Sequence, residues 1–448
     1  MKKSLYTIFL SFVVSVSIFA TDGYLSLGYG AFHKGLAGAG IGLHYTALIN
    51  GNPASNVFLD KTFSVGVAFF NPNRQYTIEG NPSGMPGTFG LAPGTIESDS
   101  KLFVIPSIAA NLPLNDKSAL GLSFYGNGGM NTNYPTQTFH DQSIESTGVN
   151  LMQMFAGITY SYKVHENHSL GVTALLAGQF FEAKGLSNFA PFSSDGTTLT
   201  NNGSSSSFGY GFKIGYHGKL SNQFSIAVVY QSKSKMSAFE EYAGLFAEQG
   251  AFDIPANITA GIVYSPTSTL RFAFDVKNIN YSGVKSIANP IDAMALPPAF
   301  LNPGGDPNNP MDYTPNPNHV PLGSDEGSGF GWEDMMVFKV GAEYDMNATT
   351  TLRAGFSHGE QPIPETEVLF NILAPGVISS HLALGLSKDI GSNGNAIHFS
   401  LNYAFNNKVE GFNPFDFDPE QAQQGNFVPN QTVILEMNQL DFAVQFTF

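Results

Sequence analysis

Apolar side chains occupy every second position in segment after segment of this chain, and no other feature restricts its possible folds as strongly. The last segment shows the pattern most clearly, with apolar side chains at Leu440, Phe442, Val444, Phe446 and Phe448. A period of two places alternate side chains on opposite faces of a β-strand. After residue 20, no stretch reaches the ~18 consecutive apolar residues of a membrane-spanning helix. The alternation therefore predicts an all-β fold.

Fourteen strands are expected where the alternation recurs, at 62–70, 100–111, 118–126, 149–163, 169–183, 206–218, 224–236, 253–265, 269–282, 334–344, 350–357, 380–389, 395–405 and 432–448. Their connections alternate between short turns and long loops. An even strand number with this loop pattern is typical of bacterial outer-membrane barrels, in which neighbouring strands satisfy every backbone polar group. We therefore predict a transmembrane antiparallel β-barrel over residues 62–448, in the bacterial outer membrane, with its long loops outside the cell.

The composition agrees with a surface that contacts something other than water. Only 12% of the residues are charged, against roughly 25% in an average soluble protein. The 20 Lys and Arg residues face 35 Asp and Glu residues, which argues against nucleic-acid binding because phosphate contacts need positive charge. The chain has no cysteine, which excludes disulfides and cysteine-ligated metal sites. A soluble β-sandwich also alternates, but the alternation of short and long connections argues against it.

Residues 1–20 have the features of a secretory signal peptide. A positive start, Met1-Lys2-Lys3, precedes an apolar run over residues 5–19 and the small residue Ala20, after which cleavage is expected. A transmembrane anchor is the alternative, but the run is short and no positively charged stop follows it.

Residues 21–61 precede the first expected strand and are rich in glycine and apolar residues, above all at 35–42. The spacing Gly38-x-Gly40 also occurs in dinucleotide-binding loops, but no βαβ unit surrounds it here. Glycine permits close backbone approach in a crowded interior, and a barrel of fourteen strands leaves a lumen wide enough to need filling. We therefore predict that residues 21–61 form a plug inside the barrel.

Several motifs, in their order and spacing, resemble the FadL-type family of outer-membrane transporters for long-chain fatty acids and other hydrophobic compounds. The most specific is the glycine-rich run 35–42 followed by Asn52-Pro53-Ala54, which resembles the Asn-Pro-Ala motif of the family's N-terminal plug, the hatch. Supporting matches lie at 230–233, 332–334, 339–344, 352–357, 370–375 and 384–387. The terminal Phe448 resembles the C-terminal signal that the barrel assembly machinery reads in outer-membrane barrels.

The resemblance implies passive uptake of long-chain fatty acids or other hydrophobic compounds by a monomer that has no cofactor and no enzymatic activity. The substrate would lodge among the outer loops, enter a pocket in the lumen and, after the hatch moves, leave through a lateral gap at a kinked third strand. The implied partners are the substrate and the lipid and lipopolysaccharide of the outer membrane. The alternatives are an aromatic-hydrocarbon channel, a general porin, which the apolar plug argues against, and a barrel hydrolase, for which no Gly-x-Ser-x-Gly motif is present.

Two sets of residues are candidates for steps of this pathway. Gly126 and Gly128 break the alternation at the end of the third expected strand, where glycine often marks a bulge or kink. In the loop after the seventh expected strand, Phe239, Tyr242 and Phe246 would share one face of a helix. That face is either a capture surface for apolar ligands or a surface packed on another loop.

The polar faces of the expected strands carry cations that could meet a substrate carboxylate, namely Lys213, Arg271, Lys277, Lys339 and Arg353. A sheltered carboxylate is stabilised by one or two such donors. The alternative is internal pairing with Asp275 and Glu343 on neighbouring strands. No metal site is expected, because the pair His165 and His168 falls in a short solvated turn.

Overall fold

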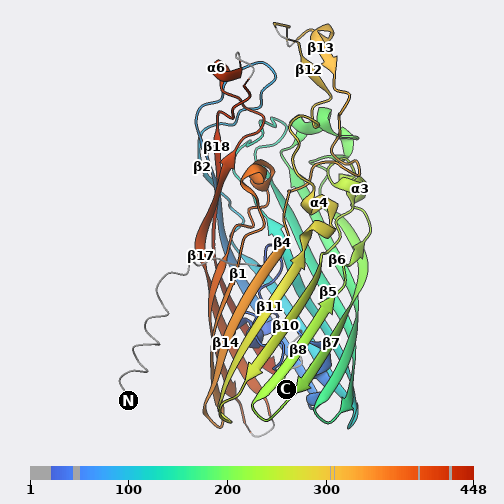
Figure 1. The fold of residues 1–448 in the computed structure, drawn as a ribbon, viewed down its shortest axis with the longest axis vertical. Helices are drawn as coiled ribbons and strands as arrows, with labels where there is room; N and C mark the ends of the chain where they lie inside the picture. The colour runs from blue at the N-terminus through green and yellow to red at the C-terminus, as the bar shows by residue number, and fades with distance from the viewer. Residues whose placement is uncertain (1–21, 44–50, 303, 307, 392–393, 423–425) are drawn as a thin grey trace, which may run out of the picture.

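The barrel wall consists of fourteen long strands in the computed structural model, which describes residues 22–43, 51–302, 304–306, 308–391, 394–422 and 426–448. The strands are β1 (Thr62–Glu79), β3 (Phe103–Asn115), β4 (Ser118–Asn131), β5 (Gly148–His165), β6 (His168–Lys184), β7 (Ser205–Lys219), β8 (Phe224–Gln231), β10 (Ala256–Tyr264), β11 (Leu270–Asn280), β14 (Met335–Asn347), β15 (Thr350–Gly359), β16 (Ser380–Asp389), β17 (Ala396–Phe412) and β18 (Thr432–Thr447). Each pairs antiparallel with its neighbours, and β1 also pairs with β18, which closes the sheet (Figure 1). The predicted fourteen-strand antiparallel barrel is confirmed.

Several strands differ from the predicted bounds, chiefly because they continue toward the long loops beyond the residues whose apolar side chains alternate. β1 extends to Glu79 instead of residue 70, and β17 extends to Phe412 instead of residue 405. In these extensions the outward side chains of β1 are polar, so the apolar pattern ends although the backbone ladder continues. The predicted strand 224–236 ends at Gln231 as β8, and a separate β9 (Lys235–Met236) turns back to pair with β7.

Outward-facing apolar side chains form a belt around the barrel. On β18 the belt runs from Phe448 to Leu440, and Asn438 is the next outward residue. Phe69 of β1 and Phe399 of β17 each stack on Phe442 of β18 with ring centroids 6.5 Å apart. Such a belt faces lipid in outer-membrane barrels, so the change to Asn438 marks its outer limit on this strand.

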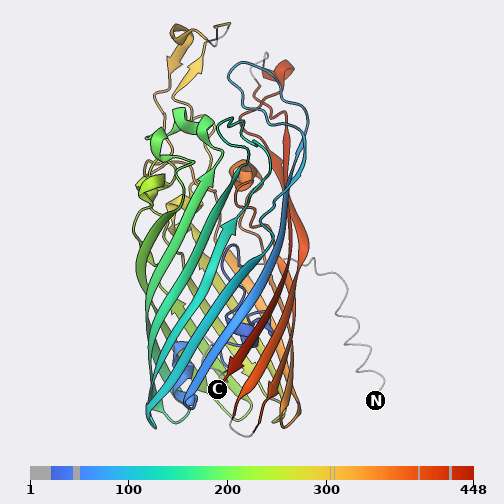
Figure 2. The same cartoon turned by 180° about the vertical axis from the view of Figure 1, so that it is seen from behind.

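The N-terminal part of the chain lies inside the barrel, as the blue segments in Figures 1 and 2 show. Helix α2 (Gly30–Lys34) contacts β1, β16, β17 and β18, and helix η1 (Pro53–Phe58) contacts β4 to β7. Small inward residues of the wall permit this packing, since Ala31 of α2 packs on Ala68 and Ala443. Residues 1–20, the predicted signal peptide, lie outside the described residues.

The long loops gather at one end of the barrel and contain only short elements. These are β2 (Gly94–Glu97), η2 (Ser187–Phe192), η3 (Gly196–Thr198), η4 (Glu240–Tyr242), α3 (Ala247–Gly250), η5 (Tyr281–Gly283), α4 (Lys285–Ala288), β12 (Ala299–Leu301), η6 (Pro310–Asp312), β13 (Tyr313–Pro315), η7 (Glu365–Glu367), α5 (Val368–Asn371) and α6 (Pro419–Ala422). β12 and β13 form a separate hairpin at the far tip (Figure 1). Among the described residues, no helix has both the length and the apolar character needed to cross a bilayer.

A charge placed on the belt is expected to destabilise the barrel. Lysine in place of Phe442 should lower the free energy of unfolding by about 2–4 kcal/mol, the cost of a lysine near the bilayer midplane. Asn438→Lys is the matched control, because this residue lies on the same face of the same strand beyond the belt. Guanidinium unfolding of both variants in lipid vesicles measures the difference. Equal destabilisation by the two lysines would contradict the assigned belt.

Candidate functional site

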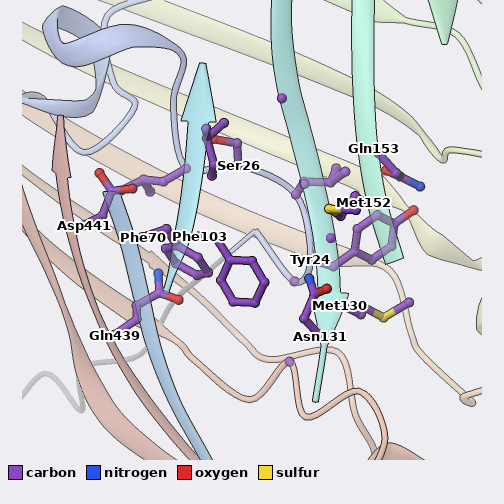
Figure 3. Close-up of a pocket in the computed structure, with 18 of the residues that line it drawn as sticks. Tyr24, Ser26, Phe70, Phe103, Met130, Asn131, Met152, Gln153, Gln439 and Asp441 are labelled. Atoms are coloured by element: carbon purple, nitrogen blue, oxygen red, sulfur yellow. The ribbon is translucent and has the colours of Figure 1, made fainter. Parts of the chain in front are cut away.

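A cavity of about 410 Å³ lies in the lumen, bounded by β1, β3, β4, β5 and the N-terminal residues 23–27. Its apolar lining includes Phe70, Phe103, Met130 and Met152 (Figure 3). Polar side chains line other parts of it, including Lys34, Arg74, Gln153, His381 and Asp441. A largely apolar cavity with a few polar groups suits a hydrophobic molecule that carries at most a small polar part.

The barrel wall beside this cavity lacks part of its hydrogen-bond ladder. β3 and β4 pair only as far as Ser107↔Tyr125, so the last residues of β4 have no partner on β3. On its other edge β4 stays paired with β5, with a shift in register between Gly126 and Gly128. A bulge of this kind bends a strand. The candidates Gly126 and Gly128 thus lie where β4, the third long strand, separates from β3; we call this break the lateral opening.

The N-terminal segment takes the place of β3 on the free edge of β4. The Ser26 amide donates to the Asn127 carbonyl oxygen at 2.8 Å, and the Gly129 amide donates to the Tyr24 carbonyl oxygen at 3.1 Å. A Cβ atom on Gly128 would lie 2.1 Å from the same Tyr24 oxygen, so this approach requires glycine. Residues 24–26 therefore cover the lateral opening from inside.

The cavity continues through the lateral opening to the outer face of the barrel. Leu102 and Val104 line the cavity although they are 66% and 59% exposed, and the outward Phe124 lines it too. Apolar side chains therefore run without interruption from the lumen to the surface that faces lipid.

A buried ion cluster holds the start of the N-terminal segment. The Asp22 carboxylate accepts from the ammonium groups of Lys277 at 2.6 Å and Lys339 at 3.0 Å. The Tyr281 hydroxyl donates to the Asp22 carbonyl oxygen at 2.6 Å. Burial alone would raise the pKa of Asp22, but the two ammonium groups hold it below its ordinary value. The contact is therefore present above the ordinary pKa and is lost when the pH falls through the lowered one.

Acid and the substitution Asp22→Asn are both expected to release this segment. Trp332 is the only tryptophan of the chain, and its ring centroid lies 5.8 Å from that of Tyr24. Its fluorescence emission should shift to longer wavelength in Asp22→Asn at neutral pH, and in the wild type only below pH 3.8. Glu97→Gln, an exposed carboxylate elsewhere, is the control. A wild-type shift near neutral pH would contradict the assigned ion cluster.

The Asn52-Pro53-Ala54 motif is fastened to the inner face of the wall. The Asn52 side chain donates to a backbone carbonyl oxygen of β7 at 3.0 Å and accepts from the Ala54 amide at 2.9 Å, which caps η1. The hydroxyls of Ser161 and Ser169 donate to the carbonyl oxygens of Pro53 at 2.6 Å and Ala54 at 2.8 Å. The motif is therefore a fixed anchor of the plug on β5, β6 and β7.

A methyl group at Gly171 is expected to loosen this anchor, because a Cβ atom there would lie 2.3 Å from the carbonyl carbon of Pro53. Overpacking of this kind costs about 1–3 kcal/mol. Gly178→Ala on the same strand is the matched control, since its nearest atom would lie 3.6 Å away. Gly171→Ala should increase ion conductance in planar bilayers while Gly178→Ala should not. Equal conductance of the two variants would contradict the anchoring role.

The predicted head-group cations have partners within the wall or on the N-terminal segment. Glu343 lies between Arg271 and Arg353, with both pairs at 2.6 Å. Lys339 is engaged by Asp22. The Lys213 ammonium donates to the Tyr125 hydroxyl at 3.1 Å. None of these four candidates lines the cavity.

The sequence offered pairing of these cations with Asp275 and Glu343 as an alternative, and the structure differs from it at Asp275. Asp275 accepts from the backbone amides of Gly40 and Ile41, at 2.7 and 3.0 Å, instead of from a cation. The carboxylate thus holds the glycine-rich part of the plug. Neither Asp22 nor Asp275 stands out in the sequence as a plug contact, because that role depends on what fills the lumen.

The capture candidates Phe239, Tyr242 and Phe246 are buried and pack around Phe181 of β6 with ring centroids 5.5, 4.8 and 4.7 Å away. The expected single helix is replaced by two short turns, η4 and α3, because Glu248 and Gln249 have positive φ. The three rings therefore belong to the loop core and form no exposed face. Phe246 also lines a second, apolar cavity of about 40 Å³ among the outer loops.

Two cations that do line the main cavity were not among the candidates. Lys34 of α2 pairs with Asp441 at 2.5 Å, and Arg74 lies on β1 above the apolar alternation. Neither position carries a sequence signal, since the first lies in the plug and the second beyond the expected end of its strand. The described residues contain no group of three or more His, Cys, Asp or Glu side chains that could hold a metal ion.

Comparisons with known proteins agree with the barrel fold. A sequence model of the family described as outer membrane protein transport protein (OMPP1/FadL/TodX) matches residues 31–409. No curated protein matches the sequence significantly. The fold is similar to a Pseudomonas aeruginosa FadL homologue, with 15% identity, 95% of this chain and 99% of that chain covered and a TM-score of 0.66. It is also similar to the Pseudomonas putida toluene transporter TodX (16%, 94% and 98%, 0.63) and the Ralstonia pickettii toluene transporter TbuX (15%, 94% and 98%, 0.57).

Proposed function

Because the chain belongs to the outer membrane protein transport family (OMPP1/FadL/TodX), we propose that it carries hydrophobic small molecules from outside the cell into the outer membrane through the lateral opening. The observation that carries this proposal is the cavity that reaches from the lumen to the lipid-facing side chains Leu102 and Val104. Long-chain fatty acids are the proposed substrates. Aromatic hydrocarbons are the alternative, since TodX and TbuX are toluene transporters.

The pathway begins at the outer loops and ends in lipid. The outer loops, whose aromatic core around Phe181 borders a small apolar cavity, would meet the molecule first. The main cavity then shelters the molecule from the polar lipopolysaccharide that opposes its direct passage. Each buried CH₂ group contributes about 0.8 kcal/mol, so the step from water to cavity is favourable without an energy source. No reacting group is required for this transfer.

Release requires residues 24–26 to leave the edge of β4. Two backbone hydrogen bonds and the Asp22 ion cluster hold this segment, whereas the Asn52-Pro53-Ala54 anchor stays in place. When the segment moves inward, the apolar lining of the cavity meets the lipid-facing surface directly. The proposed hatch movement is therefore a local displacement of the N-terminal segment.

Uptake by cells tests the substrate class. A bacterial strain in which the gene is deleted should lose most of its accumulation of tritiated oleate, and the wild-type gene should restore it. Toluene accumulation, measured in parallel, separates the fatty-acid proposal from the aromatic alternative. Unchanged uptake of both compounds would refute the proposed function, and a large steady conductance of the purified protein in planar bilayers would favour a general porin.

A disulfide across the lower edge of the lateral opening tests the route. A Cβ atom on Gly126 would lie 3.9 Å from the Cβ atom of Ile105, within the range of a disulfide, and the chain has no other cysteine. The double variant Ile105→Cys/Gly126→Cys should transport oleate slowly when oxidised and recover with reductant. Ile105→Cys alone is the control and should not respond to reductant. Full transport by the oxidised double variant would rule out the lateral route.

A further inference from the structure

We propose that a groove on the outward face of β1, β17 and β18, on the side of the long loops, binds the sugar head of a lipopolysaccharide molecule. The groove has a volume of about 200 Å³, and Asn73, Gln75, Asn406 and Glu436 are among the residues that line it. The inference concerns the outer surface of the barrel. It does not depend on which compound the lumen carries.

The groove begins where the apolar belt ends. On β18 the last belt residue is Leu440, and the next outward side chain, Asn438, already lines the groove. Asn73 of β1 lies opposite Asn438 and donates to its amide oxygen at 2.9 Å. Residues directly beyond the belt on the loop side meet the head groups of the outer leaflet. In the outer membrane these head groups are the phosphorylated sugars of lipopolysaccharide.

A β-bulge in β17 turns an additional amide into the groove. The register between β17 and β18 shifts between Ala404 and Asn407, so that Phe405 and Asn406 both oppose Asn438. Both are exposed, whereas strict alternation would turn Asn406 toward the lumen. Bulges re-aim side chains in this way. The bulge thus gives the groove a polar group that a regular strand would not supply.

A carboxylate in the groove is held in a fixed orientation by two amides. Asn406 Nδ2 donates to Glu436 Oε1 at 2.5 Å, and Gln75 Nε2 donates to Glu436 Oε2 at 2.8 Å. Among the described residues, Glu436 has no salt-bridge partner. Each oxygen of a carboxylate has more than one acceptor site. Glu436 can therefore accept further hydrogen bonds from the hydroxyl groups of a ligand.

The charges of the groove favour sugar hydroxyls over a phosphate group or a metal ion. Its lining contains two cations and two carboxylates, namely Arg74, Lys101, Glu97 and Glu436. Lys101 pairs with Glu97 at 2.8 Å, so no excess of positive charge is offered to a phosphate. The described residues also contain no group of three acidic or histidine side chains that could hold a metal ion. Amides and a carboxylate match the mixed donors and acceptors of a sugar.

The belt below the groove provides a surface for the acyl chains of the same molecule. Tyr403 and Phe405 of β17 are exposed there, with ring centroids 5.3 Å apart. Leu440 of β18 lies opposite Tyr403 and is exposed too. Aromatic side chains are common at this level of outer-membrane barrels, where apolar and polar surroundings meet. One lipid can thus contact the rings with its chains and the amides with its head.

Binding of lipids with and without sugars tests the inference. The purified protein in tetraethylene glycol monooctyl ether, a detergent without sugars, is titrated with deep-rough lipopolysaccharide or with phosphatidylglycerol, and native mass spectrometry counts the bound lipids. Glu436→Ala should weaken lipopolysaccharide binding about tenfold, the effect of losing a hydrogen bond to a charged group, and leave phosphatidylglycerol unchanged. Asn406→Ala, at an exposed position, should also weaken it. Glu410→Ala, which removes an exposed carboxylate of β17 outside the groove, is the matched control.

The direction of the effect separates hydrogen bonding from general electrostatics. Lipopolysaccharide is anionic, so charge alone would make it bind more tightly when an outward carboxylate is removed. Unchanged or tighter binding by Glu436→Ala, or equal weakening by Glu410→Ala, would overturn the role of the groove.

Two measurements on the wild type remove the dependence on a folded variant. Lipopolysaccharide should bind at least tenfold more tightly than phosphatidylglycerol, and EDTA should not release it. Equal binding of the two lipids would refute the recognition of sugars. Release by EDTA would overturn the inference in favour of a contact bridged by divalent cations.

Discussion

Every backbone polar group within a bilayer needs a partner in the protein, and this requirement links the wall of the barrel to its contents. A closed sheet meets it everywhere except where a strand pair is interrupted. At the end of β4 the missing partner is supplied by residues 24–26, with an antiparallel bridge between Leu25 and Gly128. The lateral opening and the N-terminal segment are therefore two parts of one structure, since the segment satisfies the edge that the opening exposes.

Charged side chains in the lumen also need partners in the protein. A cation in a sheltered lumen is stabilised by a carboxylate nearby; the wall strands β14 and β18 supply Glu343 and Asp441, while Asp275 of β11 accepts from backbone amides of the plug. Two of these acids hold the plug, because Asp275 binds the backbone of the glycine-rich run and Asp441 binds Lys34. The plug is thus positioned by charges on the wall as well as by the small side chains that permit its close approach.

The barrel could be predicted from the sequence because successive residues of a strand face lipid and lumen in turn. Apolar side chains therefore recur at every second position. The prediction stopped where this alternation ends: above the belt the outward side chains of β1 are polar, and the extension of the strand beyond residue 70, with Arg74, was missed. The pairing of Arg271 and Arg353 with Glu343 could not be decided either. It depends on the register Arg271↔Glu343↔Arg353, and a long loop between β11 and β14 leaves that register open. Burial of Phe239, Tyr242 and Phe246 was one of two open alternatives, because a loop sequence does not show what packs on it.

The two ends of the plug are held in different ways, and the difference argues for which end moves. The Asn52-Pro53-Ala54 end uses four neutral hydrogen bonds to its own cap and to three adjacent strands, and Gly171 leaves it no room to shift. The Tyr24–Ser26 end uses two backbone hydrogen bonds to a strand edge and one charged residue, Asp22, shared between two lysines. It also borders a cavity into which it can be displaced. The hatch movement that we propose would therefore displace the Tyr24–Ser26 end, while the Asn52-Pro53-Ala54 end keeps its contacts with the wall.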